Sequence, residues 1–151
     1  MEPFKKIETL RLIIRQLDYD DKQAFISLMT NGIITQNLAL DNSMKTQAGA
    51  LLVLNKTIES YATKDSLLAF AIEHKSINTF IGICGISTVD TYSVEIFYAF
   101  LPGFWGKGFA TETLIKLRDY LASETSVKKI HAYITPSNVA FIEVAGKAKF
   151  N

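Results

Sequence analysis

The stretch that decides the fold of this chain is Val94-Glu95-Ile96-Phe97-Tyr98-Ala99-Phe100-Leu101-Pro102-Gly103-Phe104-Trp105-Gly106-Lys107-Gly108-Phe109-Ala110-Thr111-Glu112. Its first half is apolar and aromatic, as in a buried strand, and Pro102-Gly103 then breaks the chain. Gly106 and Gly108 follow, and an amphipathic helix is predicted from Gly108 to about Ser123. The free backbone N–H groups and the dipole at such a helix start bind phosphate groups. Glycines at the turn leave room for a pyrophosphate to approach.

Alternating and helical patterns on both sides of this stretch extend the prediction. Strands are expected at Leu67–Glu73, Phe80–Ser87 and Ser93–Phe100, and their short polar connections favour an antiparallel meander. A further strand is predicted at Lys129–Ile134 and a last helix from Asn138 to about Lys149. The helix after the turn is expected to bury four residues at helical spacing, namely Ala110, Leu114, Leu117 and Leu121.

The N-terminal third is predicted to form a strand and two helices. Residues 10–17 alternate, which places Leu10, Leu12 and Ile14 on one face of a half-buried strand. A helix is expected after Asp18 through Met29, ended by Asn31-Gly32, and a second helix from about Thr46 to Tyr61. The order of elements predicts a mixed α/β (α+β) fold, with a mostly antiparallel sheet flanked by helices in a single domain over residues 1–151.

Composition excludes several classes of protein. Hydrophobic residues make up 48% and charged residues 21% of the chain, so a folded domain is expected. The formal net charge is +1, which gives no support to nucleic-acid binding. No apolar run approaches the ~20 residues of a membrane span. The single cysteine, Cys84, excludes a disulfide scaffold and favours a cytoplasmic protein, and no His/Cys cluster has the spacing of a metal site.

Two other phosphate-binding loops fit the glycine turn poorly. A P-loop ends in Gly-Lys-Ser/Thr, whereas Lys107 is followed by Gly108. The dinucleotide fingerprint needs a third glycine and a parallel strand–helix–strand unit, and neither is evident in the sequence.

Four blocks in order resemble the GNAT acetyltransferases, and specifically their RimJ/RimL-like branch, which acetylates ribosomal-protein N-termini. The segment Trp105-Gly106-Lys107-Gly108-Phe109-Ala110 is similar to the acetyl-CoA loop Gln/Arg-x-x-Gly-x-Gly/Ala, with Trp105 at the Gln/Arg position. The other three blocks are the opening strand at residues 7–15, the Ile-Gly-x-x-Gly pattern at residues 80–86, and the final helix at residues 138–150.

The resemblance implies acetyl-CoA as co-substrate, no metal, and a set of binding residues. The glycine loop and helix start would hold the pyrophosphate, and the end of the preceding strand would pair with the pantetheine arm. A main-chain N–H near Phe100 would stabilise the oxyanion, and Asn138 would contact the pantetheine. The implied cofactor-binding residues are Tyr98, Ala99, Phe100, Trp105, Gly106, Lys107, Gly108, Phe109, Ala110, Thr111 and Asn138.

Acetyl transfer to an amine needs a base for the ammonium and a proton for the departing thiolate. Glu95 is the candidate base, and an ordinary strand carboxylate is an equally weighted alternative. Glu73 and Asp90 are weaker candidates, and His74 is expected to be a solvated histidine. Phe141 stands where the branch has a serine as proton donor, which leaves Tyr133 as a candidate substitute, although a half-buried strand tyrosine is favoured. CoA is a tolerable leaving group without a protein acid.

The last helix departs from the family pattern at Gly146 and Lys149, and the sequence stops where the family continues into a final strand. The fold is therefore expected to lack that strand, and pairing with a second copy in a homodimer would cover the edge left open. The resemblance implies a protein N-terminal α-amine as acceptor, with polyamines or aminoglycosides as alternatives. A CoA-binding module with little or no catalysis is the alternative function.

Overall fold

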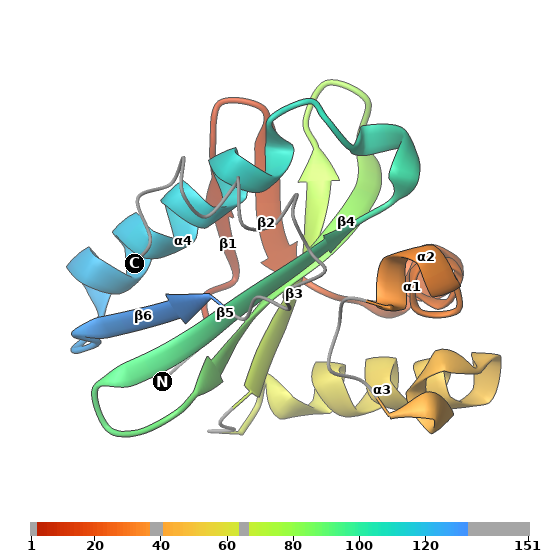
Figure 1. Ribbon diagram of the computed structural model, residues 1–151, viewed down its shortest axis with the longest axis horizontal. Coiled ribbons are helices and arrows are strands. Elements are labelled where there is room, and N and C mark those ends of the chain that lie inside the picture. Colours follow the sequence, from red (N-terminus) through yellow and green to blue (C-terminus); the bar gives the residue numbers. More distant parts are fainter. Residues whose placement is uncertain (1–2, 37–40, 64–66, 133–151) are drawn as a thin grey trace.

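The computed structural model describes residues 3–36, 41–63 and 67–132 (Figure 1). The last predicted helix, with Asn138 and Phe141, and the candidate acid Tyr133 lie outside these residues. In chain order the elements are β1 (Lys6–Glu8), β2 (Leu12–Gln16), η1 (Tyr19–Asp21), α1 (Lys22–Met29), α2 (Gly32–Thr35), η2 (Asn42–Lys45), α3 (Gln47–Ser60), β3 (Leu67–His74), β4 (Thr79–Thr88), β5 (Ser93–Phe100), η3 (Pro102–Phe104), α4 (Phe109–Glu124) and β6 (Lys129–Ala132).

The described strands form one six-stranded sheet in the order β1-β2-β3-β4-β5-β6. The pairs from β1 to β5 are antiparallel, which confirms the predicted meander of β3, β4 and β5. The pair β5–β6 is parallel, with Ser93 opposite Lys129 and Ile96 opposite Ala132. The structure therefore contains a parallel strand–helix–strand unit that was not evident in the sequence. Helix α4 crosses over the sheet and returns the chain to the end of the sheet at which β5 began, so β5, α4 and β6 form such a unit.

The N-terminal strand is a hairpin, not one continuous strand. The N–H of Thr9 donates to the Leu12 carbonyl at 2.9 Å and the Leu12 N–H donates to the Thr9 hydroxyl at 2.9 Å, so the chain turns between β1 and β2. Leu10 lies in this turn and is 90% exposed, in contrast to its predicted burial. Leu12 and Ile14 are buried as expected.

The first helical segment is also divided. Asp18 caps the short η1 turn, α1 ends at Met29, and the side chain of Asn31 accepts the Ile33 N–H to start the unpredicted helix α2. The second predicted helix, α3, lies within one residue of its expected bounds, because the Thr46 hydroxyl accepts the Gly49 N–H as an N-cap.

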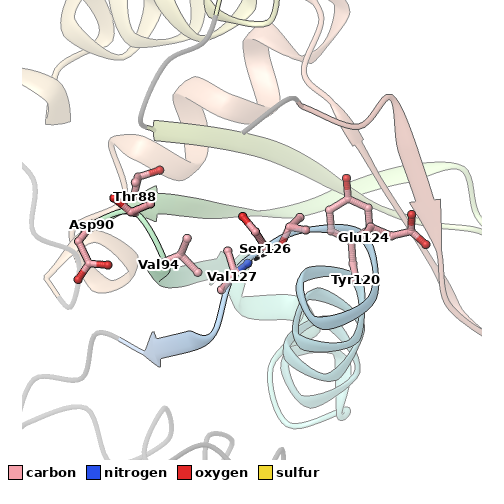
Figure 2. A pocket seen from close by; sticks show the side chains of 9 residues that line it. Thr88, Asp90, Val94, Tyr120, Glu124, Ser126 and Val127 are labelled. Carbon is pink, nitrogen blue, oxygen red and sulfur yellow. Dashed lines mark hydrogen bonds between the residues drawn. The ribbon is translucent and has the colours of Figure 1, made fainter.

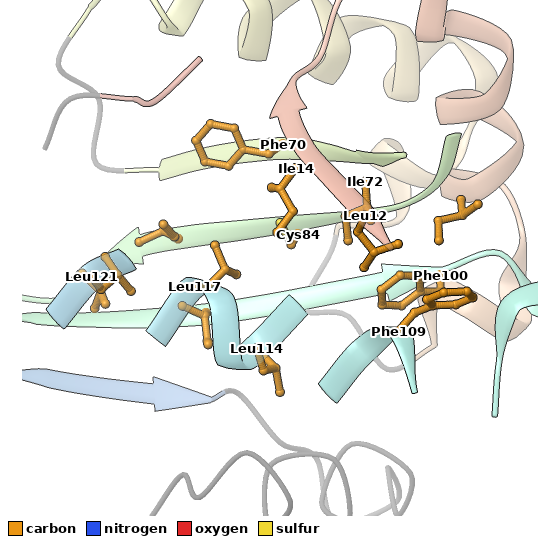
Figure 3. Packing of buried hydrophobic residues seen from close by; sticks show 14 residues of the cluster. Leu12, Ile14, Phe70, Ile72, Cys84, Phe100, Phe109, Leu114, Leu117 and Leu121 are labelled. Atoms are coloured by element: carbon orange, nitrogen blue, oxygen red, sulfur yellow. The ribbon is translucent and has the colours of Figure 1, made fainter. Parts of the chain in front are cut away.

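The sheet carries a hydrophobic cluster on each face. Helix α4 packs on one face, where Leu114, Leu117 and Leu121 are fully buried as predicted, whereas Ala110 is only partly buried (Figure 3). Helices α1, α2 and α3 contribute to the other cluster and group away from α4 (Figure 1). Cys84 lies in the α4-side core as a free thiol, and burial raises its pKa above the ordinary value.

The backbone of β5 comes close to Gly82, which lies next to a β-bulge in β4. The register of β3 with β4 shifts between Ile72, which faces Gly82, and Glu73, which faces Phe80. A Cβ atom at Gly82 would lie 2.4 Å from the carbonyl oxygen of Ala99. Only glycine allows this approach, and it sets the path of β5 just before the glycine turn.

Candidate active site

The turn between β5 and α4 leaves the first backbone N–H groups of α4 uncapped. Gly106 and Gly108 have φ of 72° and 83°, a left-handed conformation that favours glycine. Gly108 is the N-cap residue, makes no side-chain cap, and accepts the Glu112 N–H at 3.1 Å as the first bond of the helix. The N–H groups of the first turn, at Phe109, Ala110 and Thr111, therefore precede the first intrahelical bond. A Cβ at Gly106 would meet no atom within 4 Å, so the loop is open on the side toward which a Gly106 side chain would project.

The carboxylate of Glu112 ties this helix start to the β1–β2 turn. Glu112 accepts the Arg11 Nε at 2.8 Å, the Arg11 backbone N–H at 3.0 Å, and the hydroxyl of Thr9. Partial burial acts to raise the pKa of Glu112, but the hydrogen bonds from Thr9 and Arg11 outweigh it and hold the pKa below its ordinary value. The Arg11 Nη1 also donates to the carbonyl of Lys107 at 3.0 Å.

Phe109, the first residue of α4, lies between a cation and an imidazole. The Arg11 guanidinium carbon is 4.3 Å from the centroid of the buried Phe109 ring, and the His74 ring meets the same ring edge-on at 5.2 Å. His74 is half-buried and its Nδ1 lies 3.0 Å from the Ser76 hydroxyl. His74 is therefore partly solvated, and the Phe109 ring at the helix start packs against one side of its imidazole.

The end of β5 presents backbone groups away from β4. The N–H of Leu101 donates to the Ile81 carbonyl at 2.9 Å, so Leu101 faces β4. Backbone groups alternate along a strand, and the N–H and C=O of Phe100 therefore point to the opposite side, where β6 lies. Within the described residues β6 reaches only to the level of Ile96. Phe100 lies beyond this level, and its N–H is directed to the same side of β5 as β6.

Trp105 closes the turn over the end of β5. Its indole Nε1 donates to the carbonyl oxygen of Phe100 at 2.7 Å, and 48% of the residue is exposed. The ring of Tyr98 lies 5.6 Å from that of Phe100 on the α4 side of the sheet, and burial raises the Tyr98 pKa. Lys107 is exposed beside the loop, with its ammonium 6.0 Å from the Phe104 ring.

Glu95 is half-buried on the opposite face of β5, the face that also carries Ala99 and the helices α1 to α3. Its neighbours across the sheet are Ser87 on β4 and His131 on β6. Glu95 precedes Phe100 by five residues, which is roughly 16 Å along an extended strand. A carboxylate at that distance can reach an amine near Phe100 only through water molecules.

The two weaker carboxylate candidates lie elsewhere. Glu73 accepts the Arg15 Nε at 3.3 Å, and the same guanidinium binds the buried Asp21 carboxylate at 2.8 Å through both terminal nitrogens. Asp90 lies in the β4–β5 turn, where it accepts the Tyr92 N–H at 2.9 Å. The whole length of β5 separates Asp90 from the glycine loop, so the structure does not bring it to the predicted site.

A cavity of about 440 Å³ lies at the far end of α4 from the glycine loop. It is lined by Asp90, Val94, Tyr120 and Glu124 among others, with hydroxyl groups at its rim (Figure 2). Of the described residues proposed for the site from the sequence, only the weaker base candidate Asp90 lines this cavity.

Sequence reasoning missed the connections of Arg11, Thr9 and Glu112. Thr9 and Arg11 lie in the opening block at residues 7–15, and Glu112 ends the stretch that contains the glycine turn. Arg11 and Glu112 are 101 residues apart, and only the folded chain shows that they meet. In the described ranges no three His, Cys, Asp or Glu residues gather as metal ligands, and no helix combines the length and apolarity of a membrane span.

The family assignment rests on comparison with known proteins. The sequence profile of the acetyltransferase (GNAT) domain matches residues 11–151. The chain is 28% identical over 139 residues to the uncharacterized N-acetyltransferase YoaA of Bacillus subtilis (strain 168), covering 91% of this chain and 77% of that protein.

Two solved structures share the fold at lower identity. RimL, the ribosomal L7/L12 α-N-protein acetyltransferase in complex with coenzyme A, matches with a TM-score of 0.81 and 17% identity, covering 95% of this chain and 82% of RimL. Spermidine N-acetyltransferase from Vibrio cholerae, in complex with CoA and spermine, matches with a TM-score of 0.79 and 19% identity, covering 93% of this chain and 81% of that one.

The described sheet, the glycine turn at the start of α4 and the family match together define the class of protein. The chain belongs to the GNAT acetyltransferase family, and it is an N-acetyltransferase.

Proposed function

We propose that this chain transfers the acetyl group of acetyl-CoA to a primary amine, and that the acceptor is a protein N-terminal α-amine. The observation that carries the proposal is the uncapped start of α4 behind Gly106 and Gly108. Three N–H groups, a helix dipole and open space beside the loop suit a pyrophosphate.

Each predicted cofactor residue has a role in this proposal. The N–H groups of residues 106–111 bind the pyrophosphate, the Thr111 hydroxyl adds a donor, and Lys107 adds positive charge. The strand end from Tyr98 to Phe100 pairs with the pantetheine arm along the side that faces away from β4. Trp105 donates a hydrogen bond to the Phe100 carbonyl and so lies beside the proposed path of the pantetheine arm. Asn138 remains part of the proposal, although it lies outside the described residues.

The proposed chemistry divides between backbone and side chain. The thioester supplied by the co-substrate is the acetyl donor. The Phe100 N–H donates a hydrogen bond to the carbonyl oxygen of the acetyl group as negative charge develops there. Glu95 takes the ammonium proton through intervening water, as its distance from Phe100 requires. Tyr133 is the candidate proton donor for the thiolate.

The acceptor proposal rests on the likeness of four sequence blocks to the ribosomal-protein branch. The structural match to RimL accompanies it, and an equally close match to a spermidine acetyltransferase favours small polyamines as the second candidate. We also propose a cytoplasmic location, which suits a buried free thiol, and a homodimer.

One experiment tests binding and turnover separately. Calorimetric titration with acetyl-CoA should give saturable binding, and a thiol assay should detect free CoA when amines are supplied. A panel of N-terminal peptides, spermidine and an aminoglycoside then identifies the acceptor. Turnover with peptides alone supports the proposal, and turnover with spermidine alone overturns its acceptor. Binding without turnover by any amine favours a CoA-binding module, and absence of binding refutes both functions.

A further inference from the structure

We propose that Arg11 is the positioning residue of the glycine loop: by holding the Lys107 carbonyl, it turns the N–H of Gly108 outward, toward the pyrophosphate. This inference rests on the proposed function, and it assigns a role to a residue of the β1–β2 turn nearly a hundred positions before the loop.

The argument starts from the peptide bond between Lys107 and Gly108. In a planar trans peptide the C=O and the N–H point in opposite directions. The Arg11 Nη1 donates to the Lys107 oxygen at 3.0 Å, so the carbonyl faces Arg11 and the Gly108 N–H faces away from it. Glycines at positions 106 and 108 give the loop many alternative conformations, and a hydrogen bond to the intervening carbonyl selects one of them.

Arg11 can hold the loop because its own side chain is fixed. Its Nε donates to Glu112 at 2.8 Å and its guanidinium covers the ring of Phe109. The carboxylate of Glu112 is held in turn by the hydroxyl of Thr9 and by the Arg11 backbone N–H. The planar guanidinium thus joins a carboxylate on the first turn of α4 to a carbonyl of the preceding loop, which a single ammonium group cannot do with the same geometry.

The role predicts a selective defect. The side chain of Arg11 contacts the Lys107 carbonyl, the Glu112 carboxylate and the Phe109 ring, which all belong to the loop and the helix start. The pantetheine and acetyl group would bind elsewhere, at the end of β5. Removing the guanidinium should weaken ligands that carry the pyrophosphate and leave ligands without it unchanged. A general loss of folding would weaken both kinds of ligand.

The test compares Arg11→Met with Arg118→Met, a matched change at a half-buried arginine on α4 that pairs with Asp119. We expect the Kd for CoA, measured by calorimetry, to rise about tenfold in Arg11→Met, the loss typical of one hydrogen bond to a charged group. The KM for acetyl-CoA should rise by the same factor with kcat within about twofold. With S-acetylpantetheine, which lacks the pyrophosphate, kcat/KM should be unchanged. Arg118→Met should match the wild type in every measurement.

Several results would overturn the proposal. Equal losses with acetyl-CoA and S-acetylpantetheine would show a merely structural role, and an unchanged Kd for CoA would show that the contact is idle. If Arg11→Met does not fold, Arg11→Lys replaces it in the test, since lysine keeps the positive charge and the aliphatic part of the side chain and loses only the planar guanidinium. The same selective rise in the Kd for CoA is expected for Arg11→Lys, and an unchanged Kd refutes the role. A wild-type protein that does not bind CoA would refute the proposed function and this inference together, whereas equal binding by wild type and variant refutes the inference alone.

Discussion

Replacing Gly82 with alanine should separate β4 from β5 at the point where β5 enters the candidate active site. The new Cβ would lie 2.4 Å from the Ala99 carbonyl oxygen and 2.9 Å from the Phe100 Cδ1. The strands must move apart by roughly 1 Å to restore ordinary contact, because the nearest atom belongs to backbone. Overpacking of this kind lowers the free energy of unfolding by about 1–3 kcal/mol, and weakened hydrogen bonds between β4 and β5 add to this loss. Alanine also restricts the unfolded chain more than glycine does, which offsets about 0.5 kcal/mol of the loss.

We therefore expect Gly82→Ala to lower the free energy of unfolding by about 2–3 kcal/mol, or the Tm by about 5–10 °C for a chain of this size. Calorimetric melting and urea titration measure the change. Gly103→Ala is the matched control, because a Cβ there meets no atom within 4 Å and the backbone is not left-handed. A Tm within about 1 °C of the wild type for Gly82→Ala, together with a normal turnover rate, would refute the close approach of the two strands.

Four further predictions address the catalytic and structural roles of single side chains. Glu95→Gln should reduce kcat at least tenfold with an unchanged Kd for CoA, and an unaltered kcat would remove Glu95 as the base. The pKa of Glu112 is lower in the folded than in the unfolded chain. The stabilising effect of the carboxylate is therefore present at neutral pH and is lost as the pH falls below about 4.5 through the folded pKa. The Tm difference between wild type and Glu112→Gln should shrink from pH 7 to pH 3, and a constant difference would contradict this. Trp105→Phe removes one hydrogen bond to the Phe100 carbonyl and should cost about 0.5–1.5 kcal/mol in urea titration, whereas a more stable variant would show that the bond is not formed. The buried Cys84 thiol should react with a thiol reagent only after unfolding, so rapid labelling of the native protein would contradict its place in the core.

Sequence patterns predicted the helices and strands well where the spacing of apolar residues was regular. The strands β3, β4 and β5 and the helices α3 and α4 lie within one or two residues of their expected bounds, because apolar spacing and the Thr46 cap act over one or two turns of chain. The N-terminal hairpin was missed, since the alternating pattern continues through Leu10 although the backbone turns there. A pattern of side chains does not show a turn that is closed by the hydroxyl of Thr9.

For the candidate site too, features formed by neighbouring residues could be predicted from the sequence, and features that depend on strand pairing could not. Gly106, Gly108 and the start of α4 were evident from the sequence, because a glycine turn before an amphipathic helix is a local signal. Three features were not evident from the sequence: the position of Asp90 at the opposite end of β5, the ion pair of Glu73, and the contact of His74 with Phe109. Each of them depends on which strands pair and in which register.

By itself the sequence determined most of the elements, the glycine turn before α4 and the family, all of which depend on residues close together in the chain. Only the tertiary structure decided that β6 lies parallel to β5 and that Arg11 reaches the carboxylate of Glu112 and the carbonyl of Lys107. The physical reason is that a hydrogen bond between distant segments forms only when the register of every intervening strand brings donor and acceptor to about 3 Å. That register is a property of the whole packed sheet.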